Sequence, residues 1–450
     1  MKTDRQIGSG ASAHSHRHPL LLCLSVFFEC LGEVSDPKAR RRVRWTPQAA
    51  SRAAVLMALD ENAALRERFQ HARSCMQREG RGPRRSPTTY NGLMKALERQ
   101  HHVTLPLMKR ELRGQIRRRL LRIDPTGVWT LLAVDGSKED LPRTRDHERI
   151  FGMADNGVYP QAFLTAVVEV QTGLPWDWRL GEARASERRH FLEMIADLPG
   201  DALLLADAGF VGLPIWERLC VKEQPFLIRV GGNVRLLTDL WPQTPTTRQR
   251  DLVYVWPQKA RETSAPLKLR LIRVGSGPKT VYLLTNVLDS QRLSRSAAGA
   301  IYRKRWGVEL FYRTLKRTWG CAKLRSKAAR RARLELEWTL VALTLTTLLG
   351  IDAAVKRRRD PRRLSPAQVI RTLRAALRNS TASGPSGRDT LERALGRCLK
   401  DAYQRKASKP SRHRLTTTNT PNPERKPPQI RKATPLERKE ALNYYPNIAA

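Results

Sequence analysis

The sequence IYRKRWGVELFYRTLKRTWG, residues 301–320, has the apolar spacing of a helix with one buried side. A helix turns about 100° per residue, and at this spacing a set of polar residues falls within an arc of about 80° beside the apolar side. The polar stripe consists of Tyr302, Arg305, Glu309, Arg313 and Lys316, and the apolar stripe of Ile301, Val308, Phe311, Leu315 and Trp319. A solvated helix would mix Glu and Lys to form i,i+4 pairs. This one instead presents a single carboxylate among groups that can hold phosphate.

Two further carboxylates each follow an apolar run. Residues 127–134, GVWTLLAV, predict a buried strand that leads into Asp135, and residues 202–206, ALLLA, predict a second strand that leads into Asp207. Either aspartate alone could be a helix cap or a turn residue. Two acids at the ends of strands, together with Glu309, favour a metal site instead. Three converging carboxylates repel one another unless divalent cations neutralise them, and hard oxygen ligands select Mg²⁺, with Mn²⁺ able to substitute.

The spacing Tyr302-x2-Arg305-x3-Glu309-x6-Lys316 resembles the signature of the insertion-sequence-four family of DDE transposases, whose Glu is the third catalytic acid. The segment around Asp135 resembles the DG-type motif of the family, and the segment around Asp207 resembles its D-x-G-F-like motif. Two shorter segments also match: Tyr-Pro-Gln-Ala at residues 159–162 and Leu-Thr-Asn at residues 284–286.

The resemblance implies an α/β fold with an RNase H-like, retroviral integrase-like catalytic core and a β-rich insertion at about residues 211–298. It implies catalytic and metal-binding roles for Asp135, Asp207 and Glu309. DNA contacts are expected from Tyr302, Arg305, Arg313 and Lys316, and Arg229 resembles a further arginine that touches DNA in the family. Cut-and-paste members also have a Trp that stacks on a flipped base. Either Tyr282 or Trp256 takes its place here, or hairpin formation is absent.

The charge of the chain points to a polyanionic partner. Its 450 residues contain 83 Lys plus Arg against 42 Asp plus Glu, a formal net charge of +41 spread along the sequence. Such a field favours nucleic acid. The six cysteines show no CxxC pair and no zinc spacing, so they are expected to be reduced. These features predict a cytoplasmic, nucleoid-associated bacterial protein that is not a membrane protein.

Composition and periodicity suggest five regions. Residues 1–35 form an uncertain leader, unstructured or arising from an upstream start codon, and residues 36–123 a basic helical DNA-binding domain. Residues 124–351 form the catalytic domain, ending in the apolar run 334–351, expected to be a core helix under the sheet. Residues 352–403 are a C-terminal helical region, and residues 404–450 a basic disordered tail without periodicity.

The function expected from the resemblance is that of a DNA transposase. It would bind the terminal inverted repeats of an insertion sequence, cleave them with two metal ions and join them to target DNA, as a homodimer in the synaptic complex. Two alternatives use the same features. A two-metal nuclease or resolvase would release its product without joining it, and a decayed or domesticated DNA-binding protein would keep the basic surface and lose the chemistry.

Overall fold

The computed structural model describes residues 24, 26–31, 45–78, 89–124, 127–153, 157–241, 251–277, 280–378, 387–400 and 426–444. The chain divides into two compact units, one formed by residues 1–112 with 333–399 and the other by residues 113–332 with 400–450. This division differs from the expected regions in two places. The whole apolar run 334–351 groups with the N-terminal helices, and the C-terminal helical region belongs to the same helical unit as far as residue 399.

The helical unit is built from long helices and the short 3₁₀ helix η1. They are η1 (Val26–Leu31), α2 (Pro47–Leu59), α3 (Leu65–Arg78), most of α4 (Tyr90–Ile123), most of α10 (Ala329–Lys356), α11 (Pro366–Arg378) and α12 (Gly387–Leu395). Helix α2 begins as the sequence indicates: the Thr46 hydroxyl accepts the Ala49 amide at 3.2 Å, and Pro47 occupies the first helical position. Part of the expected unstructured leader is ordered, because Phe28 is fully buried and its carbonyl accepts Gln48 Nε2 at 3.0 Å.

Helix α10 is long and apolar enough to cross a membrane by length and composition, but 89% of its apolar window is buried inside the protein. Its Glu337 meets His101 of α4 across 2.6 Å, and several of its threonine hydroxyls bond to carbonyls one turn earlier. These contacts are those of a core helix that satisfies its own polar groups.

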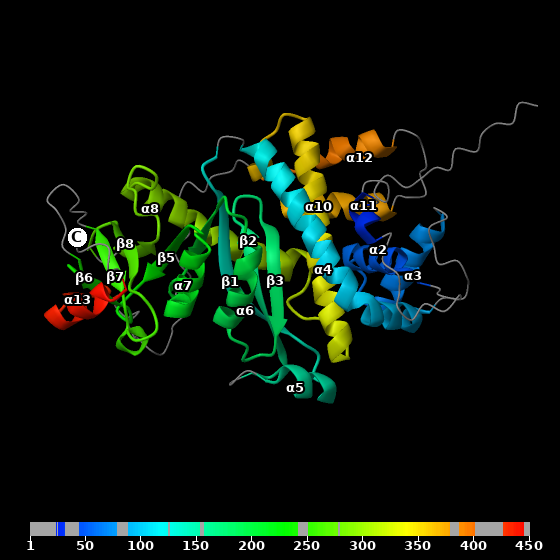
Figure 1. The fold of residues 1–450 in the computed structure, drawn as a ribbon. Coiled ribbons are helices and arrows are strands. Elements are labelled where there is room, and N and C mark those ends of the chain that lie inside the picture. The colour runs from blue at the N-terminus through cyan, green and yellow to red at the C-terminus, as the bar shows by residue number, and fades with distance from the viewer. Residues whose placement is uncertain are drawn as a thin grey trace, which may run out of the picture. The chain divides into compact units, whose positions relative to one another are not determined.

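A ten-stranded sheet organises the second unit (Figure 1), in the order β10-β6-β7-β8-β9-β5-β4-β1-β2-β3. Strands β1, β4 and β5 are parallel, whereas β2 is antiparallel to both β1 and β3. The strands are β1 (Thr130–Asp140), β2 (Gln161–Glu169), β3 (Leu174–Gly181), β4 (Ala202–Ala206), β5 (Phe226–Val230), β6 (Arg235–Thr238), β7 (Leu252–Val255), β8 (Leu267–Val274), β9 (Val281–Thr285) and β10 (Gln429–Lys432).

The parallel part of the sheet carries the most apolar sequence. All five residues of β4 are buried, as expected for a strand covered on both faces. Helix α6 (Glu187–Met194) precedes β4, and α7 (Leu213–Val221) connects β4 to β5, which gives the parallel pair its crossover. Helix α7 and strand β5 fall inside the expected insertion at 211–298, yet they continue the parallel part of the sheet. Strands β6 to β9 then extend the same sheet beyond β5.

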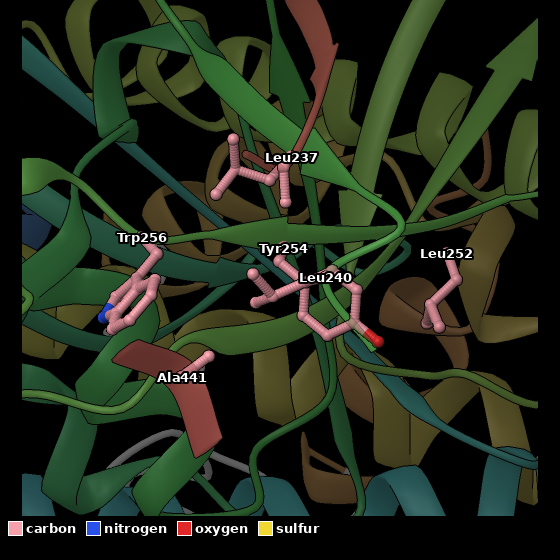
Figure 2. Packing of buried hydrophobic residues seen from close by; sticks show 7 residues of the cluster. Leu237, Leu240, Leu252, Tyr254, Trp256 and Ala441 are labelled. Carbon is pink, nitrogen blue, oxygen red and sulfur yellow. The ribbon is translucent and has the colours of Figure 1, made fainter. Parts of the chain in front are cut away.

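The expected disordered tail is partly ordered. Strand β10 pairs in parallel with β6, and α13 (Pro435–Leu442) follows it with a complete capping box between Thr434 and Glu437. Figure 2 shows Ala441 of α13 beside a buried cluster of the insertion that includes Leu240, Tyr254 and Trp256. Residues 401–425 lie outside the described residues. The C-terminal segment is therefore part of the second unit.

Candidate active site

Strand register places the two aspartates level with each other. In the parallel β1–β4 pair, Ala133 lies opposite Leu205, so Asp135 and Asp207, each two residues further on, share one level and one face. Strand β1 does not end at Asp135 as expected, but continues to Asp140 through its pairing with β2. Only its pairing with β4 ends before Asp135. The side chain therefore has a rigid backbone and an open side where β4 stops.

The backbone next to each aspartate orients its carboxylate. Asp135 Oδ1 accepts the Gly136 amide at 2.8 Å, and Asp207 Oδ1 accepts the Gly209 amide at 2.7 Å, which caps a short 3₁₀ turn. Burial raises the pKa of Asp135, and the negative charges of Asp207 and Glu309 raise it further, although the Gly136 amide and Arg305 oppose the rise. Asp207 and Glu309 are therefore close enough to Asp135 to affect its charge.

The segment carrying Glu309 is helical but not one regular helix. It comprises α8 (Arg295–Arg303), a 3₁₀ turn (Lys304–Trp306), α9 (Gly307–Arg313) and a π-helical turn (Thr314–Thr318). The expected apolar stripe is buried at Val308, Phe311, Leu315 and Trp319. A Cβ on Gly307 would lie 2.3 Å from the Val170 carbonyl oxygen. Only glycine allows α9 to approach the end of β2 so closely, and this contact sets the depth at which Glu309 enters the site.

Two tyrosines of this segment bind the backbone of the strands that carry the aspartates. The Tyr302 hydroxyl donates to the carbonyl of Ala206, the residue before Asp207, at 3.2 Å. The Tyr312 hydroxyl donates to the Asp135 carbonyl at 2.8 Å and accepts the Ala166 amide at 3.1 Å. Burial raises the pKa of Tyr302 to about 12, so it stays a neutral donor. Tyr302, expected to contact DNA, holds a strand in this conformation, and Tyr312 was not foreseen.

Arg305 lies among the acids. Its Nη2 is 2.9 Å from Glu309 Oε1, and its charge lowers the pKa of Asp135 and of Tyr302. The arginine side chain is 14% exposed and the glutamate 32%. In this conformation Arg305 supplies the positive charge that the carboxylates need.

The remaining expected DNA contacts differ in their surroundings. Arg313 is exposed. Lys316 donates to the Lys138 carbonyl on β1 at 2.7 Å. Arg229 lies two residues beyond Leu227, the partner of Leu205, so it shares the level and face of Asp207. Its charge lowers the pKa of Tyr302.

The structure does not bring the expected stacking residues to this site. Tyr282 lies opposite Val230 on β9, so it projects from the other face of the sheet than Arg229. Trp256 is buried in the core of the insertion (Figure 2). Its Nε1 donates to the Ser264 carbonyl at 2.8 Å. An aromatic ring that is available near the acids is Trp306, which is 54% exposed and adjacent to Arg305.

Glu187, at the first position of α6, is a fourth acid beside the aspartates. A Cβ on Gly136 would lie 2.9 Å from its Oε2, and a Cβ on Gly209 would lie 2.9 Å from its Oε1. Burial raises the pKa of Glu187, and the charges of Asp207 and Asp135 raise it further. Sequence reasoning missed this residue, because a Glu in the first turn of a helix is ordinary. The one signal in the sequence is the pair of glycines Gly136 and Gly209, which follow Asp135 and Asp207. Because they lack side chains, they leave room for Glu187.

The donor set fits a hard divalent cation. Asp135, Asp207 and Glu309 offer carboxylate oxygens alone, and their mutual repulsion is the kind that such a cation relieves. Within the described ranges, however, no group of three His, Cys, Asp or Glu side chains is arranged closely enough to hold a metal ion. Glu309 would have to exchange the Arg305 guanidinium for the cation.

Comparisons with known proteins place this chain beside transposases. Residues 129–345 match the family described as "Transposase DDE domain". Transposase InsG for insertion sequence element IS4, from Escherichia coli (strain K12), is 27% identical over 244 residues, covering 50% of this chain and 53% of that protein. The chain thus spans about half the length of this relative. A solved structure of the piggyBac transposase synaptic complex with hairpin DNA is similar with a TM-score of 0.44 and 13% identity, over 86% of each chain.

Residues 129–345 thus match the transposase DDE domain, with Asp135, Asp207 and Glu309 inside the matched region. The resemblance to the DDE transposases of the insertion-sequence-four family is confirmed by this match and by the similarity to the IS4 element transposase.

Proposed function

We propose that this protein is a DNA transposase that cleaves the ends of an insertion sequence and joins them to target DNA at one metal-dependent site. The observation that carries the proposal is the shared level of Asp135 and Asp207 in the parallel sheet, with Glu309 of α9 close enough to raise the pKa of Asp135. The strand order β3-β2-β1-β4-β5, with β2 antiparallel and β1, β4 and β5 parallel, supports an RNase H-like core. Strands β6 to β9 would form the inserted part.

Asp135, Asp207 and Glu309 would hold two Mg²⁺ ions. When bound, the ions activate the attacking water or 3′-hydroxyl and stabilise the leaving 3′-oxygen. The protein contributes rigid placement: Tyr312 fixes the backbone of Asp135, Tyr302 fixes the residue before Asp207, and Gly307 fixes the depth of α9. Arg305, once displaced from Glu309, is placed to bind a non-bridging phosphate oxygen through its planar fork of donors.

DNA binding would use basic groups around the acids. Arg229 lies level with Asp207, and Arg313 and Lys316 lie further along the helical segment from Glu309. The exposed ring of Trp306 is available for stacking on an unpaired base. We propose terminal inverted repeats and target DNA as the substrates, synapsis by a homodimer, and action in the bacterial cytoplasm at the nucleoid.

The test uses the full chain with DNA fragments carrying the ends of its own element. Asp135→Asn, Asp207→Asn and Glu309→Gln should each abolish end cleavage while end-DNA binding persists. Asp201→Asn, which changes an acid just before β4, serves as the control and should cleave normally. Near wild-type nicking in magnesium by one of the three variants would remove that residue from the ligand set. Cleavage without joining to a target plasmid would favour a nuclease or resolvase.

A further inference from the structure

Glu139 is a buried carboxylate on the face of β1 that carries Asp135. The two residues are four apart on one strand, so their side chains share a face about 14 Å apart at ~3.4 Å per residue. Glu139 has 0% exposure, and neither of its carboxylate oxygens accepts a hydrogen bond of ordinary geometry from the described residues, although the side chains of Ser137 and Lys316 are close enough to lower its pKa. Burying a carboxylate with no well-formed hydrogen bond is costly, so a functional reason for Glu139 is expected.

The cation that faces this carboxylate is Lys316 of the π-helical turn. Its Nζ lies 3.6 Å from Glu139 Oε1 and donates to the carbonyl of the neighbouring Lys138 at 2.7 Å. The side chain of Lys316 remains 34% exposed. An ammonium has three N–H donors. One is taken by the Lys138 carbonyl, one is attracted by Glu139, and one remains for an outside anion.

We propose that Glu139 is a positioning residue for Lys316: its carboxylate fixes the ammonium against the Lys138 carbonyl, at a set distance along β1 from Asp135. Lys316 then meets a DNA phosphate one or two nucleotides from the scissile one. The DNA contact rests on the proposed function, whereas the pairing of Glu139 with Lys316 does not. If the carboxylate served packing alone, an apolar side chain of the same size would do so better.

The pH dependence of stability distinguishes a carboxylate that pairs with Lys316 from one that serves packing alone. Burial raises the pKa of Glu139 from 4.5 to about 7, and Lys316 opposes the rise. The other titratable groups coupled to it are Asp140 of its own strand, which raises its pKa, and Tyr312 of α9, which is neutral and fully buried. The folded chain binds a proton at Glu139 that the unfolded chain releases between pH 4.5 and about 7. The stability contribution of Glu139 is therefore full below pH 4.5 and falls as the pH rises to about 7.

A first experiment needs no DNA and measures urea unfolding against pH for the wild type, Glu139→Gln, Lys316→Ala and the exposed control Glu182→Gln. The difference in unfolding free energy between the wild type and Glu139→Gln should fall between pH 4.5 and about 7. The same difference between the wild type and Glu182→Gln should not change with pH. In Lys316→Ala the unfolding free energy should continue to fall above pH 7, because the cation that favours the ionised form of Glu139 is gone. An unchanged range in Lys316→Ala would overturn the pairing. If Glu139→Gln fails to fold, the pairing is tested by comparing Lys316→Ala with the wild type. The measured quantity is then the pH range over which the unfolding free energy of each falls.

A second experiment measures end cleavage against pH. The wild-type rate should rise through about pH 7, and Glu139→Gln should stay about tenfold lower without that rise, as for a misplaced contact. Lys316→Ala and the double variant should have equal rates, since the two residues act as one unit, while Lys327→Ala should match the wild type. A double variant slowed by the product of the two single effects would overturn the inference. If the wild type cleaves no DNA, the proposed function fails, and the first experiment still decides the pairing.

Discussion

The hydroxyl of Tyr312 donates to the backbone carbonyl of Asp135 across 2.8 Å, and thereby joins the helix of the third acid to the strand of the first. The same oxygen accepts the amide of Ala166, which lies opposite Asp135 in the β1–β2 ladder. Ten residues earlier, Tyr302 makes the matching contact to Ala206 before Asp207. Two hydroxyls thus set the positions of both aspartates relative to Glu309.

Tyr312→Phe should destabilise the chain by ~1–3 kcal/mol, because a buried carbonyl and a buried amide lose their partner. End cleavage should fall by about 10- to 100-fold through misplacement of Asp135 relative to Glu309. Urea unfolding and single-turnover cleavage would measure the two effects. Tyr282→Phe, on the opposite face of the sheet, is the control and should change neither. Wild-type cleavage by a destabilised Tyr312→Phe would mean that the contact serves stability alone.

Gly307→Ala tests the approach of α9 to β2. A Cβ there would meet the Val170 carbonyl at 2.3 Å, and backbone cannot yield as a flexible side chain can. The helix must shift outward and carry Glu309 with it, so cleavage should fall at least tenfold. Gly200→Ala, where a Cβ would meet nothing within 4 Å, is the matched control. Equal cleavage by both variants would show that Glu309 does not depend on this contact.

The strands before Asp135 and Asp207 could be predicted from the sequence because a buried strand depends on local pattern. Strand β4 is the apolar run at 202–206, and Glu309 follows from the spacing within one helical segment. The end of β1 was misplaced because β2, not the local sequence, supports residues beyond Asp135. Glu187 was missed because only the packing of α6 against the strand ends brings it to Gly136 and Gly209.

The ordered C-terminal segment shows a second limit. The four residues of β10, QIRK, have no strand pattern of their own, and all are exposed. They become a strand because the edge of β6 offers unpaired backbone groups, a partner about 190 residues away in sequence. A long-range pairing of this kind leaves no periodic signal, so the composition of the tail favoured disorder.

Salt should weaken non-specific DNA binding steeply. With a formal net charge of +41, the chain should release counterions from many phosphates. If six or more phosphates are contacted, the affinity should fall by ~10³-fold or more between ~50 and ~200 mM salt. Fluorescence anisotropy of a labelled duplex would measure it. An affinity that hardly changes would assign the positive charge to another partner.

Glu437 should hold the C-terminal segment on the insertion. Its side chain has 2% exposure, and Arg431 bonds to it at 2.5 and 2.7 Å, with Arg261 on the same carboxylate. Hydrogen bonds from Arg431, with smaller contributions from Thr434 and Arg261, lower the pKa of Glu437 to about 2. A lowered pKa stabilises the fold above the unfolded value of 4.5, and this stability is lost as the pH falls from 4.5 towards 2.

Glu437→Gln should therefore destabilise the second unit at neutral pH by ~1–3 kcal/mol, because charged hydrogen bonds to the carboxylate are lost while Arg431 itself stays half exposed. It should also reduce the loss of stability between pH 4.5 and 2. Urea unfolding followed by tryptophan fluorescence would report it, because Trp256 packs against Tyr444 with ring centroids 6.1 Å apart. Glu182→Gln is the control and should unfold like the wild type. If Glu437→Gln unfolds at the wild-type midpoint at every pH, the C-terminal segment does not depend on this carboxylate for its place beside β6.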